Sequence, residues 1–128
     1  MTADGMQFNP ANPALDEPAF RRLLTLAGPE APELMRRLRA DLRDVAEGLT
    51  AGFANADRLA LRKHSHVLLA IAGTIGAQPI HRLALDLNLR SKDDTCVFAA
   101  SDAADLLHRL TVLQDRLREM SAERDAER

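Results

Sequence analysis

Apolar residues recur every three or four positions along most of the chain, which is the spacing of α-helices that bury one face. The longest pattern extends from about Pro32 to Phe53, and charged residues occupy most of its other positions. Its apolar stripe consists of Leu34, Leu38, Leu42, Val45, Leu49 and Phe53. The same spacing predicts four other helices: over about 17–27, from 56 or 58 to about 75, over 78–91 and over 101–121.

Residues that favour the two ends of helices separate these patterns. Candidate N-caps precede three of them: Asp16, Asn55 or Asp57, and Ser101 with Asp102. Helix-ending residues follow two of them: Gly28 with Pro29, and Gly76 with Pro79. Short connections predict an all-α protein, an up-and-down antiparallel four-helix bundle with a short extra N-terminal helix. We expect a flexible N-terminal arm over residues 1–15, the bundle over 16–121 and a frayed polar tail over 122–128.

Composition narrows the possible functions. The 17 basic and 19 acidic residues nearly balance, so the overall charge gives no reason to expect nucleic-acid or membrane binding. No apolar stretch approaches the ~20 residues of a membrane-spanning helix, and the N-terminus lacks the features of a secretory signal. The one cysteine, Cys96, belongs to no cluster with metal-ligand spacing. We therefore expect a soluble, cytoplasmic protein without a metal site.

The third predicted helix carries a histidine on its outward face. On a helical wheel, the residues opposite His66 are Leu61, Leu68, Ile71 and Ile75, which form the apolar stripe. The residues beside His66 on the wheel are Arg62, Lys63, Leu69, Ala70, Gly73 and Ala77, and Thr74 and Gln78 follow near the exposed end of the helix. The positions after His66 are mostly small, which leaves room for another protein to approach the imidazole. Arg62 and Lys63 precede His66 by one turn and can pair with a negative group attached to its ring.

Gly73 costs about 1 kcal/mol relative to Ala inside a helix, so its presence needs a reason. Close approach of a partner or close packing of helices would supply one. The alternative is a helix that simply tolerates a glycine. The other three histidines have weaker patterns. His64 lies near the apolar stripe and is predicted to be a partly buried structural residue, and His81 and His108 are predicted to lie on the surface.

The segment His66–Ala77, HVLLAIAGTIGA, resembles the signature of histidine phosphotransfer (HPt) domains. That signature reads approximately H-x-L-K-G-[SA]-[SA]-G-x-[LIV]-G-A. The matching positions are His66, Leu68, Ala72, Gly73, Ile75, Gly76 and Ala77, and the helix layout agrees over about residues 30–120.

The resemblance implies that His66 accepts a phosphoryl group from the aspartate of one receiver domain and passes it to another. Imidazole is apt for this transfer because its neutral form is a nucleophile. The implied partners are response-regulator receiver domains and a hybrid or sensor histidine kinase. The resemblance implies no cofactor on this chain, and Mg²⁺ is expected on the receiver. It implies a phosphotransfer intermediate with no kinase activity of its own.

Two of the departures from the family pattern matter for the chemistry, and one further position matches a supporting residue. Leu69 and Ala70 stand where the family usually has Lys and Gly. Lys63 is a candidate substitute for the missing lysine. Asn88 lies 22 positions after His66, where several family members carry an amide that hydrogen-bonds the non-reacting ring nitrogen.

Two other functions stay open on the sequence alone. Leu69 favours a degenerate HPt-like adaptor that binds receiver domains without transferring phosphate. A helical scaffold or dimerisation module would instead show an exposed apolar patch that buries ~1,000 Å² or more between copies.

Overall fold

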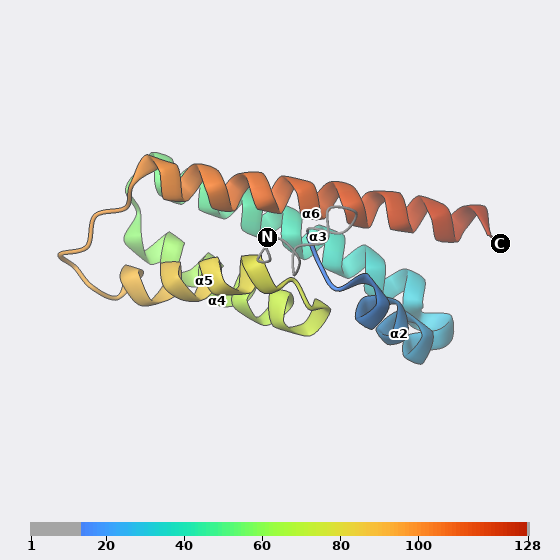
Figure 1. Cartoon of the computed structure of the whole chain (residues 1–128). Coiled ribbons are helices and arrows are strands. Elements are labelled where there is room, and N and C mark those ends of the chain that lie inside the picture. The colour runs from blue at the N-terminus through green and yellow to red at the C-terminus, as the bar shows by residue number, and fades with distance from the viewer. Residues whose placement is uncertain (1–13, 128) are drawn as a thin grey trace, which may run out of the picture.

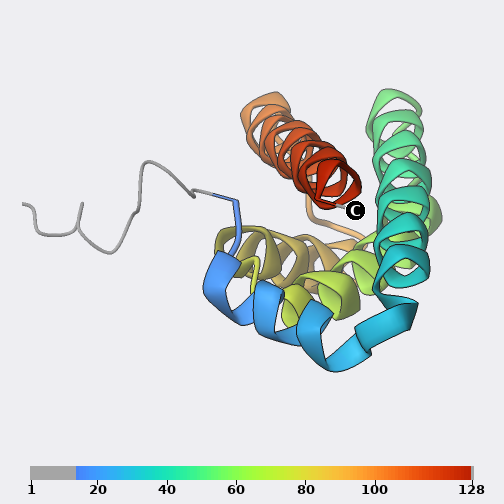
Figure 2. The same ribbon diagram turned by 90° about the vertical axis from the view of Figure 1, so that its right-hand side faces the viewer.

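The computed structural model describes residues 14–127, which form five α-helices (Figure 1). In chain order these are α2 (Glu17–Ala27), α3 (Ala31–Ala54), α4 (Arg58–Ile75), α5 (Gln78–Ser91) and α6 (Ala100–Ala126), with a 3₁₀ turn, η1, at Gly28–Glu30. Helices α3 to α6 form the antiparallel bundle (Figure 1). In the same view, α2 lies below the N-terminal part of α3 and the C-terminal half of α6. Viewed along the bundle, α3 and α6 lie above α2, α4 and α5 (Figure 2). The predicted all-α bundle is confirmed.

The core consists of the apolar stripes expected from the sequence. Helix α3 buries Leu38, Leu42, Val45 and Leu49, and α6 buries Leu106, Leu110, Leu113 and Leu117. These spacings of three and four residues direct one face of each helix inward. Of the candidate N-caps, Asp16 accepts from the Ala19 N–H and Asp57 from the Ala60 N–H, each at 3.1 Å. The prediction that Ser101 or Asp102 caps the last helix was wrong, because α6 begins after Ala99 and has no side-chain cap.

The structure corrects both predicted ends of the bundle. Residues 1–13 of the predicted arm lie outside the described residues, but Ala14 and Leu15 are buried. The Asp16 N–H also donates to the Gly76 carbonyl at 3.1 Å, so the chain is already fixed to the end of α4 there. At the other end, α6 continues through most of the predicted frayed tail to Ala126.

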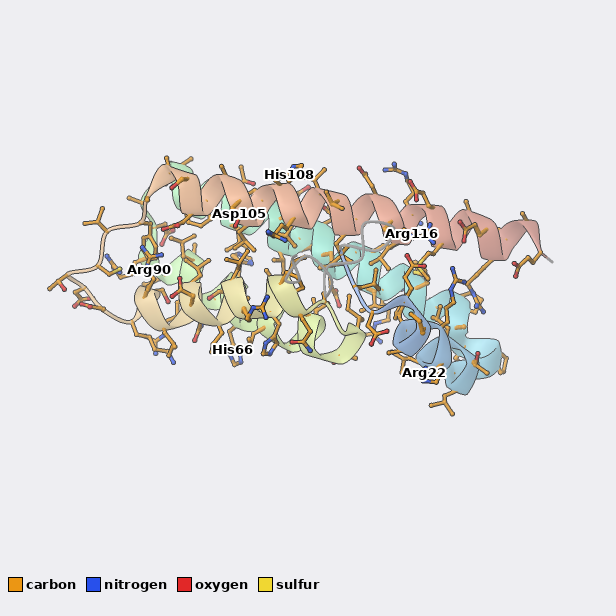
Figure 3. All side chains as sticks on the ribbon, viewed as in Figure 1. Arg22, His66, Arg90, Asp105, His108 and Arg116 are labelled. Carbon is orange, nitrogen blue, oxygen red and sulfur yellow. The ribbon has the colours of Figure 1, made fainter. Side chains whose placement is uncertain are left out.

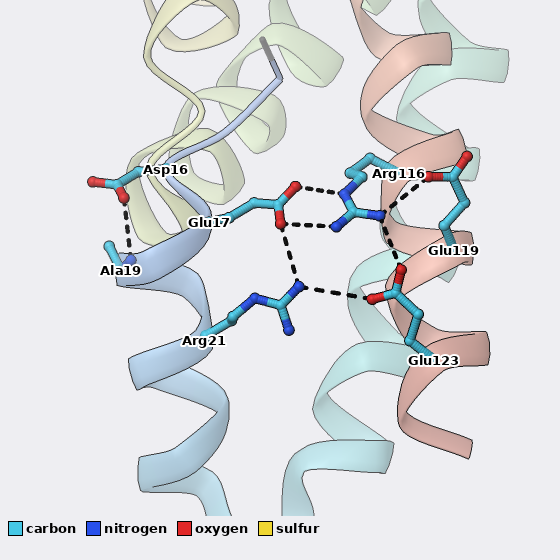
Figure 4. A network of polar contacts seen from close by, with 7 residues as sticks. All are labelled: Asp16, Glu17, Ala19, Arg21, Arg116, Glu119 and Glu123. Atoms are coloured by element: carbon cyan, nitrogen blue, oxygen red, sulfur yellow. Dashed lines mark hydrogen bonds and ion pairs between the residues drawn. The ribbon is translucent and has the colours of Figure 1, made fainter. Parts of the chain in front are cut away.

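An ion-pair network between α2 and α6 explains why both ends are ordered (Figure 4). The Arg116 guanidinium donates to both carboxylate oxygens of the buried Glu17, one of them at 2.9 Å. Arg116 also donates to Glu119 at 3.1 Å and to Glu123 at 3.3 Å. The Arg21 guanidinium nitrogen Nη2 lies 3.3 Å from Glu17 Oε1 and 3.7 Å from Glu123 Oε1. Glu123 therefore belongs to a network that holds the last turns of α6 against α2.

Glu17→Gln should lower the free energy of unfolding by about 2 kcal/mol at pH 7, since it removes the buried charge that pairs with Arg116. Hydrogen bonds from Arg116 hold the pKa of Glu17 below its ordinary value. This stabilisation is present above the pKa of an unfolded glutamate, ~4.3, and is lost as the pH falls through the lower folded pKa. Urea unfolding at several pH values should therefore show the difference between wild type and variant shrinking below about pH 4.

Glu119→Gln is the matched control, because Glu119 binds the same guanidinium but its side chain is 58% exposed. We expect it to cost less than about 1 kcal/mol. Equal losses for the two variants, or a Glu17 effect that does not depend on pH, would contradict the assignment.

Candidate functional site

His66 lies in the middle of α4 with its imidazole exposed at the edge of the bundle (Figure 3). The residues on the opposite side of α4, Leu61, Leu68 and Ile75, are at most 1% exposed. This apolar stripe holds α4 against the core and fixes the outward direction of His66. No other helix of the described chain covers the ring.

The side chains that surround His66 on α4 are mostly small or polar and open to solvent. Ala70, Gly73 and Thr74 are exposed, as is Gln78 at the start of α5, and Leu69 is half-buried. Ala77 was wrongly placed on this surface, since it is fully buried. The helical wheel fails there because α4 ends at Ile75 and Gly76 takes a left-handed conformation with φ of 77°. We call the surface formed by His66, Leu69, Ala70, Gly73 and Thr74 the docking face.

Gly73 differs from the other glycines inside helices. A Cβ on Gly48 would lie 2.2 Å from His64 Nε2, and one on Gly52 would lie 2.9 Å from Leu61. A Cβ at either position would have no room unless the His64 ring or the Leu61 side chain moved. The predicted structural role of His64 agrees with its position against Gly48. A Cβ on Gly73 would meet only the His81 ring, at an ordinary 3.5 Å. Helix packing thus supplies no reason for Gly73, which leaves the approach of a partner or a helix that simply tolerates a glycine.

Residues of α5 extend this surface in a way that the sequence did not indicate. His81 is half-buried with its ring against Gly73, so its prediction as a surface residue was only partly right. Leu85 follows His81 by one helical turn, and Leu89 follows Leu85 by another. Both leucines are substantially exposed, 40% and 57% respectively. Neither leucine belongs to the buried stripe of α5. An apolar residue outside that stripe is the sequence signal that could have identified both as surface residues.

The charge of α4 is entirely positive. The helix contains Arg58, Arg62 and Lys63 and no Asp or Glu. Arg58 is occupied, because it donates to the carbonyls of Asp93 and Cys96 at 2.7 Å. The side chains of Arg62 and Lys63 are exposed and make no hydrogen bond or ion pair with residues 14–127. They remain available for an anion near His66.

Asn88 does not contact the imidazole as the resemblance implied. Its side-chain amide is buried and donates to the Arg62 carbonyl and to Ser65 Oγ, each at 3.1 Å. Ser65 Oγ in turn donates to the same Arg62 carbonyl at 3.1 Å. The short asparagine side chain is thus held within the α4–α5 interface, one turn before His66.

Other kinds of site find no support in the described part of the chain. Residues 14–127 contain no group of three or more His, Cys, Asp or Glu side chains arranged to hold a metal ion. None of the helices described is long and apolar enough to cross a membrane.

Comparison with known proteins adds one structural match. No known family matches by sequence, and no curated protein does either. Among solved structures, the histidine-containing phosphotransfer protein B (HptB) from Pseudomonas aeruginosa PAO1 is similar, with a TM-score of 0.76 and 17% sequence identity. The match covers 88% of this chain and 97% of HptB. The chain therefore has the fold of a histidine-containing phosphotransfer protein.

Proposed function

We propose that the chain is a phosphocarrier of a His–Asp phosphorelay that uses His66 as its phosphoacceptor. The observation that carries the proposal is an exposed histidine beside a helical glycine that the packing of the fold does not require. A glycine that lowers helix stability without serving packing is explained if another backbone must come close to it. HptB, whose name states that it is a histidine-containing phosphotransfer protein, has the same fold.

In the proposed transfer, the unprotonated nitrogen of the neutral His66 imidazole attacks the phosphorus of an aspartyl phosphate on a receiver domain. A phosphorus–nitrogen bond forms as the phosphorus–oxygen bond breaks, and the aspartate leaves as a carboxylate. The reverse reaction, with the aspartate of a second receiver as nucleophile, passes the phosphoryl group on. The receiver supplies the acidic pocket and its Mg²⁺, and this chain supplies a positioned nucleophile.

The charges near His66 suit both the phosphoryl group and an acidic partner. Arg62 and Lys63 lie one helical turn before the histidine, within reach of a group on its ring. Because α4 carries no acidic residue, none of its own side chains repels the incoming phosphate. The cations also favour docking of a surface that bears an acidic active site.

The competing function is that of an adaptor that binds receivers without transfer. Leu69 favours it, since an apolar side chain replaces the lysine that would offset phosphate charge in the family pattern. Lys63 reduces the force of this argument, because it presents an exposed cation one turn before His66. The two functions differ in one outcome, which is whether phosphate moves onto this chain.

The test is transfer from purified receiver domains charged with radiolabelled acetyl phosphate and Mg²⁺. The phosphocarrier should acquire label that is labile in acid and stable in base, and should lose it to a second, uncharged receiver. Binding of receivers without any labelled adduct would favour the adaptor. Label that is stable in acid would contradict a phosphohistidine.

A further inference from the structure

A buried polar contact joins α4 to α5 at the turn that carries His66. We propose that Asn88 and Ser65 are positioning residues for phosphotransfer, acting through the main-chain carbonyl of Arg62 rather than through the imidazole. The inference deepens the proposed function and rests on it. It assigns a role to the polar cluster that these two side chains form between α4 and α5.

The cluster is almost free of solvent. Ser65 is fully buried, and Asn88 is 6% exposed. The Asn88 amide reaches both Ser65 Oγ and the Arg62 carbonyl, and the serine hydroxyl reaches that carbonyl as well. Burying such groups costs free energy unless each is hydrogen-bonded, so the contact favours one particular alignment of α5 against α4.

The shared acceptor connects this alignment to the histidine. In an α-helix the N–H of residue i donates to the carbonyl of residue i−4. The Arg62 carbonyl is therefore also the acceptor for the His66 N–H. Three donors from two helices converge on one oxygen atom, and one of them is the backbone of the proposed phosphoacceptor.

This arrangement fixes the position of His66 relative to the α5 residues that a docked receiver would also contact. His81 packs against Gly73 from α5, and Leu85 lies one turn further along that helix. A receiver that touches both helices meets His66 at a distance set by the α4–α5 alignment. Phosphoryl transfer requires in-line geometry, and a displacement of ~1 Å can slow a positioned reaction about 100-fold.

The imidazole itself makes no hydrogen bond with any residue in the described range, 14–127. The fold thus sets the position of the His66 backbone and leaves the ring to be oriented by the docked receiver. This division of roles separates the proposal from one in which an amide selects the ring tautomer.

Ser65→Ala tests the proposal, with Ser91→Ala as a matched control. Both serines are buried on the same pair of helices, and each hydroxyl donates to the carbonyl three residues earlier, Arg62 or Asn88. Transfer is measured at increasing concentrations of a charged receiver, which separates the maximal rate from the half-saturating concentration. Labelling by phosphoramidate, a small phosphodonor that needs no docking, is measured in parallel.

Ser65→Ala should lower the maximal rate of receiver-dependent transfer about tenfold, with the half-saturating concentration and phosphoramidate labelling unchanged. Ser91→Ala should leave all three quantities near wild type. Asn88→Ala should reproduce the Ser65 effect, provided that circular dichroism shows it to be folded at the assay temperature.

Equal maximal rates for the two serine variants would overturn the positioning role while leaving the phosphocarrier function intact. A loss of phosphoramidate labelling in Ser65→Ala would overturn it too, because it would place the defect in the reactivity of the ring. If wild type takes label from phosphoramidate but from no receiver, the proposed function fails and this inference fails with it.

Discussion

His66→Gln is expected to accept no phosphoryl group from any charged receiver domain. Glutamine keeps a polar side chain of similar length, and the exposed position tolerates it because the ring has no hydrogen-bond partner among residues 14–127. The substitution removes the exposed imidazole of the docking face and leaves His81, whose ring lies against Gly73, in place. The unfolding midpoint in urea should stay within the error of wild type, which would show that the loss is chemical.

The matched control is His108→Gln. His108 is also exposed, but it lies on α6, on the opposite edge of the bundle from His66 (Figure 3). This variant should take up label at the wild-type rate. Label that persists in His66→Gln would move the acceptor elsewhere, and His64 would be the first residue to examine.

Gly73→Leu is expected to leave the protein folded and to reduce receiver-dependent transfer by about two orders of magnitude. Leucine is the better helix former by nearly 1 kcal/mol, and the Cβ position of Gly73 has ordinary space beside His81. The free energy of unfolding should therefore not fall. The added side chain would stand on the docking face, where a receiver would have to approach. Gly73→Ala should give a smaller loss of transfer with a modest gain in stability.

Ala104→Leu provides the control for adding an exposed leucine to a helix. Ala104 is exposed on α6, one helical turn before His108. Urea unfolding and transfer kinetics should be close to wild type for this variant. Normal transfer by Gly73→Leu would show that the glycine is not kept free for a partner, and would remove the main support for docking at this face.

Helical periodicity was sufficient to predict the bundle and the exposure of His66. Both depend on local rules, because the spacing of Leu61, Leu68 and Ile75 decides which side of α4 faces inward. The end of α4 and the bounds of α5 followed from Gly76 and the short connection between the helices, whereas the start of α4 was left open between Asn55 and Asp57. The helical wheel applies only within the helix, and Ala77 was misplaced because it follows the end of α4 at Ile75.

Contacts between residues far apart in the sequence could not be predicted from helical periodicity. Glu17 and Arg116 are separated by 99 residues, and neither position looks special on its own helix. Their pairing orders the C-terminal turns of α6 that composition alone marked as frayed. Asn88 was identified as a supporting residue, but its contacts depend on how α5 is rotated against α4, and periodicity does not give that angle.

Locating the phosphoryl group in the wild-type protein, with all four histidines present, is the decisive experiment. The wild-type chain is charged by a phosphorylated receiver, kept at alkaline pH and mapped by tandem mass spectrometry. We expect a single phosphorylated imidazole, that of His66. A phosphoryl group found on His64, His81 or His108, with His66 unmodified, would contradict it.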